Sequence, residues 1–149
     1  MDLRSLYTGG AEGAALQLKH PVTGEPLALP PIEPAGKSRP IILQVVCKDS
    51  DRFRHFAHAQ ADKRLAEVDA TEAGKPVKRL PSSEIEANNI KLVAHCVIGW
   101  DNVILDGVEL PYSPENARKL LTEFPAFYEQ VDAFAAIRGN FVKASSSQP

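Results

Sequence analysis

The amino-acid sequence predicts an α+β fold, in which a small N-terminal β-sheet or hairpin is followed by a mostly α-helical C-terminal part. Three observations support this prediction. Six of the 12 prolines lie between Pro21 and Pro40, and they exclude a long helix from this region. The β-branched run Pro40–Cys47 is typical of a strand covered on both faces. From Ser50 onward, apolar residues recur mainly at helical spacing.

Two further strands are expected before Pro40. The segment Ala14–His20 alternates in part between apolar and polar residues, as a half-buried strand does. The turn residues of Pro21–Pro26 allow Leu27–Leu29 to return beside it as a hairpin. Together with Pro40–Cys47, these segments predict a small sheet of three strands.

A helix of about five turns is expected after Ser50. The Ser50 hydroxyl is a suitable N-cap for unpaired backbone N–H groups, and Asp51 is favourable in the first turn. A polar linker, Thr71–Ser82, follows the helix. The apolar residues expected on one face of this helix are Phe53, Phe56, Ala57, Ala61, Leu65 and Val68.

The next element begins with Ser83 as a second N-cap and becomes apolar almost all round between Ile90 and Ile98. Such a run is either a buried helix or a buried strand. Periodicity does not decide between them, although the length of the run favours a helix. After it, Asp106-Gly107 predicts a tight turn inside a small hairpin, Val103–Leu110.

Two helices that meet at a proline are expected near the C-terminus. Ser113, Pro114 and Glu115 combine a hydroxyl cap, a proline at the first helical position and an acid in the first turn. Pro125 ends this helix and starts another. The residues expected on the inner faces of the two helices are Ala117, Leu120, Leu121, Phe124, Phe127, Val131, Phe134, Ile137 and Phe141.

The chain divides into three predicted regions. Residues 1–40 form a Pro/Gly-rich segment with a β-hairpin, residues 41–142 form the main α+β domain, and residues 143–149 form a polar tail expected to be disordered. A net charge of −2, from 17 basic and 19 acidic residues, disfavours a dedicated nucleic-acid binder. Because no apolar run reaches the roughly 20 residues of a membrane span, and no secretory signal is apparent, a cytoplasmic protein without membrane contact is expected.

Catalytic, cofactor and metal sites are not expected, so the chain is predicted not to be an enzyme. Cys47 and Cys96 lie in apolar sequence and are expected to be buried thiols. His55 and His58 stand three apart on one helix and could share a metal, but no further ligand motif supports this, and solvated side chains are expected. His95 and Cys96 are adjacent, and on a helix adjacent side chains point about 100° apart. The two residues are therefore not expected to act as a base and a nucleophile.

Three stretches of the chain, taken in order, carry a family resemblance. The first, Ile42–Arg54, is a strand that runs into an Asp-Ser-capped helix; the second is Val97–Val103; the third is Leu110–Asp132, continued by Arg138–Phe141. In this order they resemble the small tail assembly chaperones of long-tailed bacteriophages and prophages. The resemblance covers most of residues 41–142.

The resemblance implies a protein that binds the long helical tape-measure protein, or other phage tail proteins, in the host bacterial cytoplasm. Such a chaperone keeps the tape measure soluble until the tail tube polymerises around it, and related systems add a longer product by ribosomal frameshifting. A tape measure exposes apolar helical stripes, which associate unless they are covered. A groove between helices could cover them.

The hypothesis for this groove is an aromatic surface around Trp100, Tyr112, Phe124 and Phe127. These side chains gather beside prolines at which helices break, although a position in the core is the alternative for each of them. Two other functions stay open, a structural component of the tail or connector that remains in the virion and a prophage regulator of a host protein. A homo-oligomer is also left open.

Overall fold

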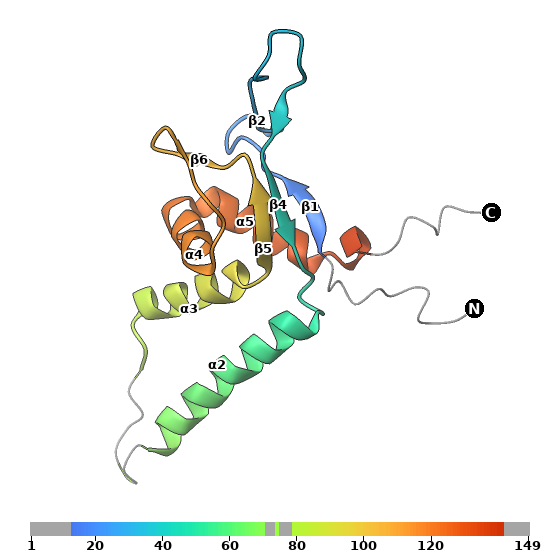
Figure 1. Cartoon of the computed structure of the whole chain (residues 1–149). Helices are drawn as coiled ribbons and strands as arrows, with labels where there is room; N and C mark the ends of the chain where they lie inside the picture. The colour runs from blue at the N-terminus through green and yellow to red at the C-terminus, as the bar shows by residue number, and fades with distance from the viewer. Residues whose placement is uncertain (1–12, 71–73, 75–78, 142–149) are drawn as a thin grey trace, which may run out of the picture.

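The computed structural model describes residues 13–70, 74 and 79–141, and Figure 1 shows how they are arranged. The predicted disordered tail, residues 143–149, lies outside the described residues, as do residues 1–12 and most of the predicted linker. Strands come first, helices follow, and three short strands are inserted among the helices. The α+β fold class is therefore confirmed.

The central sheet has three antiparallel strands in the order β1-β4-β5, and they are β1 (Ala14–Gln17), β4 (Ile42–Val45) and β5 (Val97–Asp101). Leu43 in the middle strand lies opposite Leu16 on one side and Trp100 on the other. The third strand thus comes from the C-terminal half of the chain.

The segment expected as the third strand, Leu27–Leu29, lies elsewhere. Its part β2 (Ala28–Leu29) pairs with β3 (Arg39–Pro40) in a separate two-stranded ribbon. The predicted turn does form, since the Leu27 N–H donates to the Leu18 carbonyl at 2.7 Å. The hairpin is therefore confirmed, but the composition of the three-stranded sheet was predicted wrongly, because nothing local indicates that a distant strand pairs better with β4.

The run Ile90–Ile98 is divided between a helix and a strand. Two residues, His95 and Cys96, separate helix α3 (Ser82–Ala94) from β5, which begins at Val97. The expected cap at Ser83 is wrong, because Pro81 occupies the cap position without a side-chain hydrogen bond. A proline there fixes an extended backbone, after which the helix begins at once. Both halves of the run are buried, so hydrophobicity alone does not separate them.

The hairpin predicted around Asp106-Gly107 is confirmed as β6 (Ile104–Leu105) and β7 (Val108–Glu109). Asp106 and Gly107 both have positive φ, at 54° and 78°. Two successive positive values are the signature of a type I′ turn, whose twist matches that of the strands it joins.

The two C-terminal helices are α4 (Pro114–Glu123) and α5 (Pro125–Ala136), followed by a 3-10 turn, η1 (Arg138–Phe141). The Ser113 hydroxyl accepts a hydrogen bond from the Asn116 N–H at 3.0 Å, as the cap motif predicts. Ile137 was expected on the inner face but is 55% exposed. Because α5 ends at Ala136, helical periodicity no longer applies at Ile137.

The core lies where α4 and α5 cover the sheet, with α3 packed against both helices (Figure 1). Leu43, Val97 and Val131 are fully buried, and both cysteines belong to the same cluster. Of the residues expected on the inner faces, Phe124, Phe127 and Phe134 are half-buried against this core, and the others, apart from Ile137, are buried within it.

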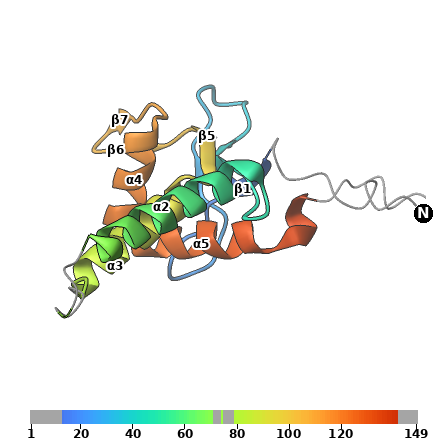
Figure 2. The same cartoon turned by 90° about the horizontal axis from the view of Figure 1, so that it is seen from below.

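Helix α2 (Asp51–Asp69) has the predicted start and length, and the Ser50 hydroxyl accepts a hydrogen bond from the Phe53 N–H at 3.3 Å. None of its 19 residues, all of which the structure describes, is buried. Leu65 is 60% exposed. Figure 1 shows α2 at the periphery of the molecule, and Figure 2, seen from below, shows it passing in front of α3. Of the apolar face of α2, Phe53 packs against the core, and the rest of the face lies outside it.

Candidate protein-binding surface

The predicted aromatic residues Trp100 and Tyr112 contact each other edge to face, with ring centroids 5.3 Å apart. The Trp100 indole N–H donates to the Leu110 carbonyl at 2.8 Å, and the Tyr112 hydroxyl donates to the Val97 carbonyl at 2.7 Å. Both side chains are half-buried against the core. These bonds fix the segment after β5 onto the sheet, while the exposed part of each ring remains accessible.

Phe124 and Phe127 form a second pair, with ring centroids 5.6 Å apart, at the break between α4 and α5. Directly beside this break is a groove of about 300 Å³, which we call the α3–α5 groove. Ile85 on its wall is 48% exposed. Its lining is Ser82, Ile85, Glu86, Asn89, Ile90, Leu121, Thr122, Pro125 and Tyr128. The predicted aromatic residues thus form two separate ring pairs, and neither Phe124 nor Phe127 lines the groove, although their chain neighbours Pro125 and Tyr128 do.

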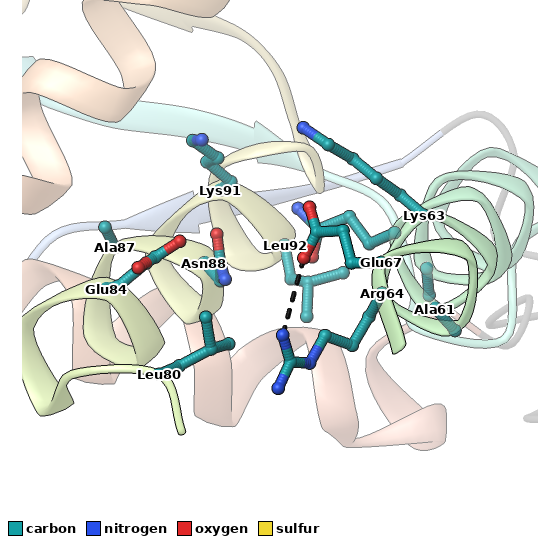
Figure 3. A pocket seen from close by; sticks show the side chains of 12 residues that line it. Ala61, Lys63, Arg64, Glu67, Leu80, Glu84, Ala87, Asn88, Lys91 and Leu92 are labelled. Atoms are coloured by element: carbon teal, nitrogen blue, oxygen red, sulfur yellow. Dashed lines mark hydrogen bonds and ion pairs between the residues drawn. The ribbon is translucent and has the colours of Figure 1, made fainter. Parts of the chain in front are cut away.

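A larger groove, of about 450 Å³, lies between α2 and α3, and we call it the α2–α3 groove (Figure 3). Ala57, Ala61 and Leu92 supply apolar surface, and Arg64 forms an ion pair with Glu67 at 3.4 Å on one wall. Lys63 and Lys91 approach the same edge from opposite helices. The other lining residues are Gln60, Leu80, Glu84, Ala87 and Asn88.

A small basic pocket adjoins this groove, because Lys91 lines both. Arg52, Lys91 and Arg118 surround it, and we call it the basic end. On its wall, the rings of Phe56 and His95 stack with centroids 4.1 Å apart and planes inclined by 10°. The remaining lining residues are Ala94, Tyr112 and Pro114.

His95 links α2 to the end of α3. Partial burial, reinforced by the nearby positive charge of Arg52, lowers the pKa of His95 below its ordinary value. The Arg52 side chain also donates to the His95 carbonyl at 3.0 Å. Near neutral pH the ring is therefore a neutral surface against Phe56, and the positive charge of the pocket comes from arginine and lysine.

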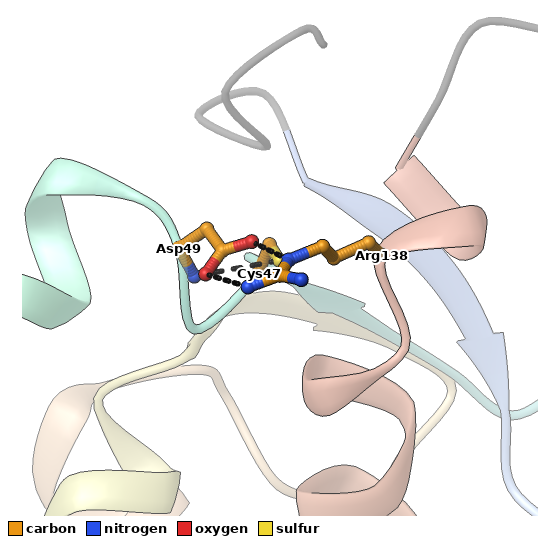
Figure 4. A network of polar contacts seen from close by, with 3 residues as sticks. All are labelled: Cys47, Asp49 and Arg138. Atoms are coloured by element: carbon orange, nitrogen blue, oxygen red, sulfur yellow. Dashed lines mark hydrogen bonds and ion pairs between the residues drawn. The ribbon is translucent and has the colours of Figure 1, made fainter. Parts of the chain in front are cut away.

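The start of α2 is fixed to the C-terminal end of the fold by a polar contact (Figure 4). The Arg138 guanidinium pairs with the Asp49 carboxylate, and the Asp49 N–H lies 3.4 Å from the Cys47 sulfur. The Arg138 hydrogen bond and charge lower the pKa of Asp49, although partial burial opposes the shift. This contact orients the connection between β4 and α2.

Asp49→Asn is expected to reduce the free energy of unfolding by at most about 1 kcal/mol near pH 7, because the Arg138 side chain of the pair is largely exposed. A lowered pKa in the folded state stabilises the fold above the ordinary value of 3.8. That contribution disappears as the pH falls through the folded pKa. Urea titrations at pH 7 and pH 3 should show the difference from the wild type shrinking, with Asp62→Asn on exposed α2 as control. An equal difference at both pH values would contradict the role of the pair.

The two cysteines are buried and free, as the sequence predicts. Burial raises the pKa of the Cys96 thiol to about 12. A thiolate is the reactive form of cysteine, so Cys96 is not prepared for nucleophilic chemistry at neutral pH.

Thiol labelling at pH 8 is therefore expected to modify neither cysteine in the folded protein. In concentrated urea both thiols should react, because unfolding removes the burial that protects them. Mass spectrometry before and after denaturation measures this directly. Rapid labelling of Cys96 in the native protein would contradict its burial.

His55 and His58 are both exposed on α2, as expected. In residues 13–70, 74 and 79–141, no three His, Cys, Asp or Glu side chains form a group that could hold a metal ion. The prediction that the chain is not an enzyme stays a prediction.

Sequence reasoning missed the α2–α3 groove and its basic end. A signal for the groove was present, since Ala57 and Ala61 leave the middle of the α2 stripe without large side chains. A stripe of small residues buries little apolar area. The basic end had no such signal, because Arg52, Lys91 and Arg118 are far apart in the sequence.

None of the helices in the described part of the chain is both long and apolar enough to cross a membrane.

Comparison with known proteins gives one family. Residues 46–148 match the family model described as YdaY prophage protein, which is more than half of the chain. No curated protein and no solved structure matches. The matched region begins directly after β4 and includes α2, α3 and both grooves. The chain belongs to the YdaY prophage protein family.

Proposed function

We propose that this prophage protein is a tail assembly chaperone, which binds the tape-measure protein and keeps it soluble in the host cytoplasm during tail morphogenesis. It acts by binding and catalyses no reaction. The observation that carries the proposal is the position of α2, a helix of 19 residues of which none is buried. A helix usually buries its apolar stripe against a core. Here two residues of that stripe, Ala57 and Ala61, line a groove open to a partner.

The shape of the surface suits a helical partner. The α2–α3 groove is bounded by two helices along its length, and an amphipathic helix binds such a groove through its apolar face. The α3–α5 groove, with half-exposed Ile85, offers a second apolar surface on the other side of α3. Two grooves on one small protein match the need to cover long apolar stripes.

The four predicted aromatic residues enter this proposal as further contacts for the partner. Phe124 and Phe127 are the better placed pair, because Phe124 directly precedes Pro125 on the wall of the α3–α5 groove. Trp100 and Tyr112 use their polar atoms within the fold. Only their ring surfaces remain for binding.

Co-expression with the long helical protein encoded just downstream tests the proposal. The partner is expected to be soluble and to co-purify only when this chain is present. Mass spectrometry of purified particles provides the second readout, since an assembly chaperone should be absent from them. A partner that is soluble alone and never associates would overturn the proposal. Detection of this chain in finished particles would favour a structural component of the tail.

A further inference from the structure

The α2–α3 groove and the basic end form one continuous surface, because Lys91 lines both and Phe56 precedes Ala57 on the same helix. Helix α2 is about 28 Å long at 1.5 Å per residue. The surface that it borders is therefore long enough for several turns of a second helix.

The net charge of this surface is opposite in sign to the net charge of the whole chain. Five cationic side chains line it and two carboxylates do so, which is a net charge of +3, whereas the whole chain carries −2. The cations are Arg52, Lys63, Arg64, Lys91 and Arg118, and the carboxylates are Glu67 and Glu84. Three cations surround the basic end, whose described lining contains no Asp or Glu.

Between these charges the floor of the surface carries apolar side chains, with Gln60 and Asn88 as polar neighbours. Ala57, Ala61 and Leu92 lie in the groove, and the stacked rings of Phe56 and His95 continue the surface into the basic end. A nucleic-acid backbone is poorly matched, because Glu67 and Glu84 in the groove lining would repel phosphates. An apolar stripe flanked by carboxylates matches both the floor and its rim.

We propose that this surface selects an acidic amphipathic helix of the partner. The apolar face of that helix packs on the floor between α2 and α3, and its carboxylates pair with Arg52, Lys91 and Arg118 at the basic end. The inference rests on the proposed chaperone function and adds to it the charge of the segment recognised. Charge complementarity of this kind gives specificity and a rapid, salt-dependent association.

Two synthetic peptides test the inference. Both are amphipathic helices with the same leucine face, and one carries glutamate where the other carries lysine. Fluorescence anisotropy with the full chain is expected to show at least about tenfold tighter binding of the acidic peptide at low salt, with the difference falling at high salt. Equal binding of the two peptides, or binding of neither, would overturn the inference.

Two variants on α4 localise the effect. Arg118→Glu should weaken binding of the acidic peptide about tenfold, whereas Lys119→Glu, which makes the same charge change outside the basic end, should have a much smaller effect. Equal effects of the two variants would overturn the assignment to the basic end. A chain that elutes as a dimer and binds no peptide would assign the surface to a second copy instead.

The chaperone function is scored separately by co-expression with the tape-measure protein. If that partner still co-purifies while Arg118→Glu has no effect on it or on the acidic peptide, only the charge selection fails. If the wild-type chain does not bind the partner at all, the proposed function fails whatever the peptides show.

Discussion

Ala61→Glu is expected to abolish co-purification of the tape-measure protein, with binding weakened about 100-fold. Ala61 lines the α2–α3 groove and is itself exposed, so the substitution does not disturb the core. A glutamate there projects into the space that a partner helix would occupy. Covering the new carboxylate with an apolar stripe then costs several kcal/mol. Pull-down with tagged chain, followed by titration of the purified pair, measures the loss.

Ala59→Glu is the matched control for this variant. Ala59 is also exposed, and it lies two residues away on the opposite side of α2, outside the groove lining. Both variants change the net charge by the same amount, so long-range electrostatics cannot separate them. Circular dichroism should show the same helix content in both. If the two variants retained the partner equally well, the α2–α3 groove would not be its binding site.

Leu43→Ala is expected to reduce the free energy of unfolding by about 2–5 kcal/mol. Leu43 is completely buried in the middle strand, opposite Leu16 and Trp100, so its removal leaves a cavity at the centre of the sheet. A domain of this kind has a total stability of about 5–15 kcal/mol. Urea denaturation followed by circular dichroism should show a large decrease in the transition midpoint.

Leu65→Ala provides the same chemical change at an exposed position. Leu65 lies on α2 and is 60% exposed, so its effect should stay within about 0.5 kcal/mol. A cost comparable to that of Leu43→Ala would mean that α2 packs more closely in solution than its exposure indicates. The pair therefore measures the burial of the core and the exposure of α2 in one experiment.

Local structure could be predicted from the sequence because it depends on neighbouring residues. The caps Ser50 and Ser113 need only the N–H groups three residues further on. Pro125 breaks the helix whatever packs around it, and Asp106-Gly107 supplies the positive φ values of its turn. The same local logic failed at Ser83, where Pro81 started the helix first.

The arrangement of the candidate aromatic residues could be predicted only in part. The aromatic residues were recognisable as residue types, and Phe124 and Phe127 do contact each other at the predicted helix break. The sequence did not separate them from Trp100 and Tyr112, because ring contacts join residues 12 positions apart in one pair and three in the other. The α2–α3 groove was missed because the amphipathic pattern of α2 predicts burial against a core, not exposure beside α3.

By itself, the sequence determined the α+β class, the starts of α2, α4 and α5, the hairpin at Asp106-Gly107 and the burial of both cysteines. Only the tertiary structure decided that β5 completes the sheet and that α2 lies outside the core. It also gathered Arg52, Lys91 and Arg118 around one pocket. The physical reason is the sequence separation over which each interaction acts. Helix caps, prolines and tight turns depend only on residues a few positions away. Strand pairing and the choice of buried face depend instead on competition among all the apolar surfaces of the chain.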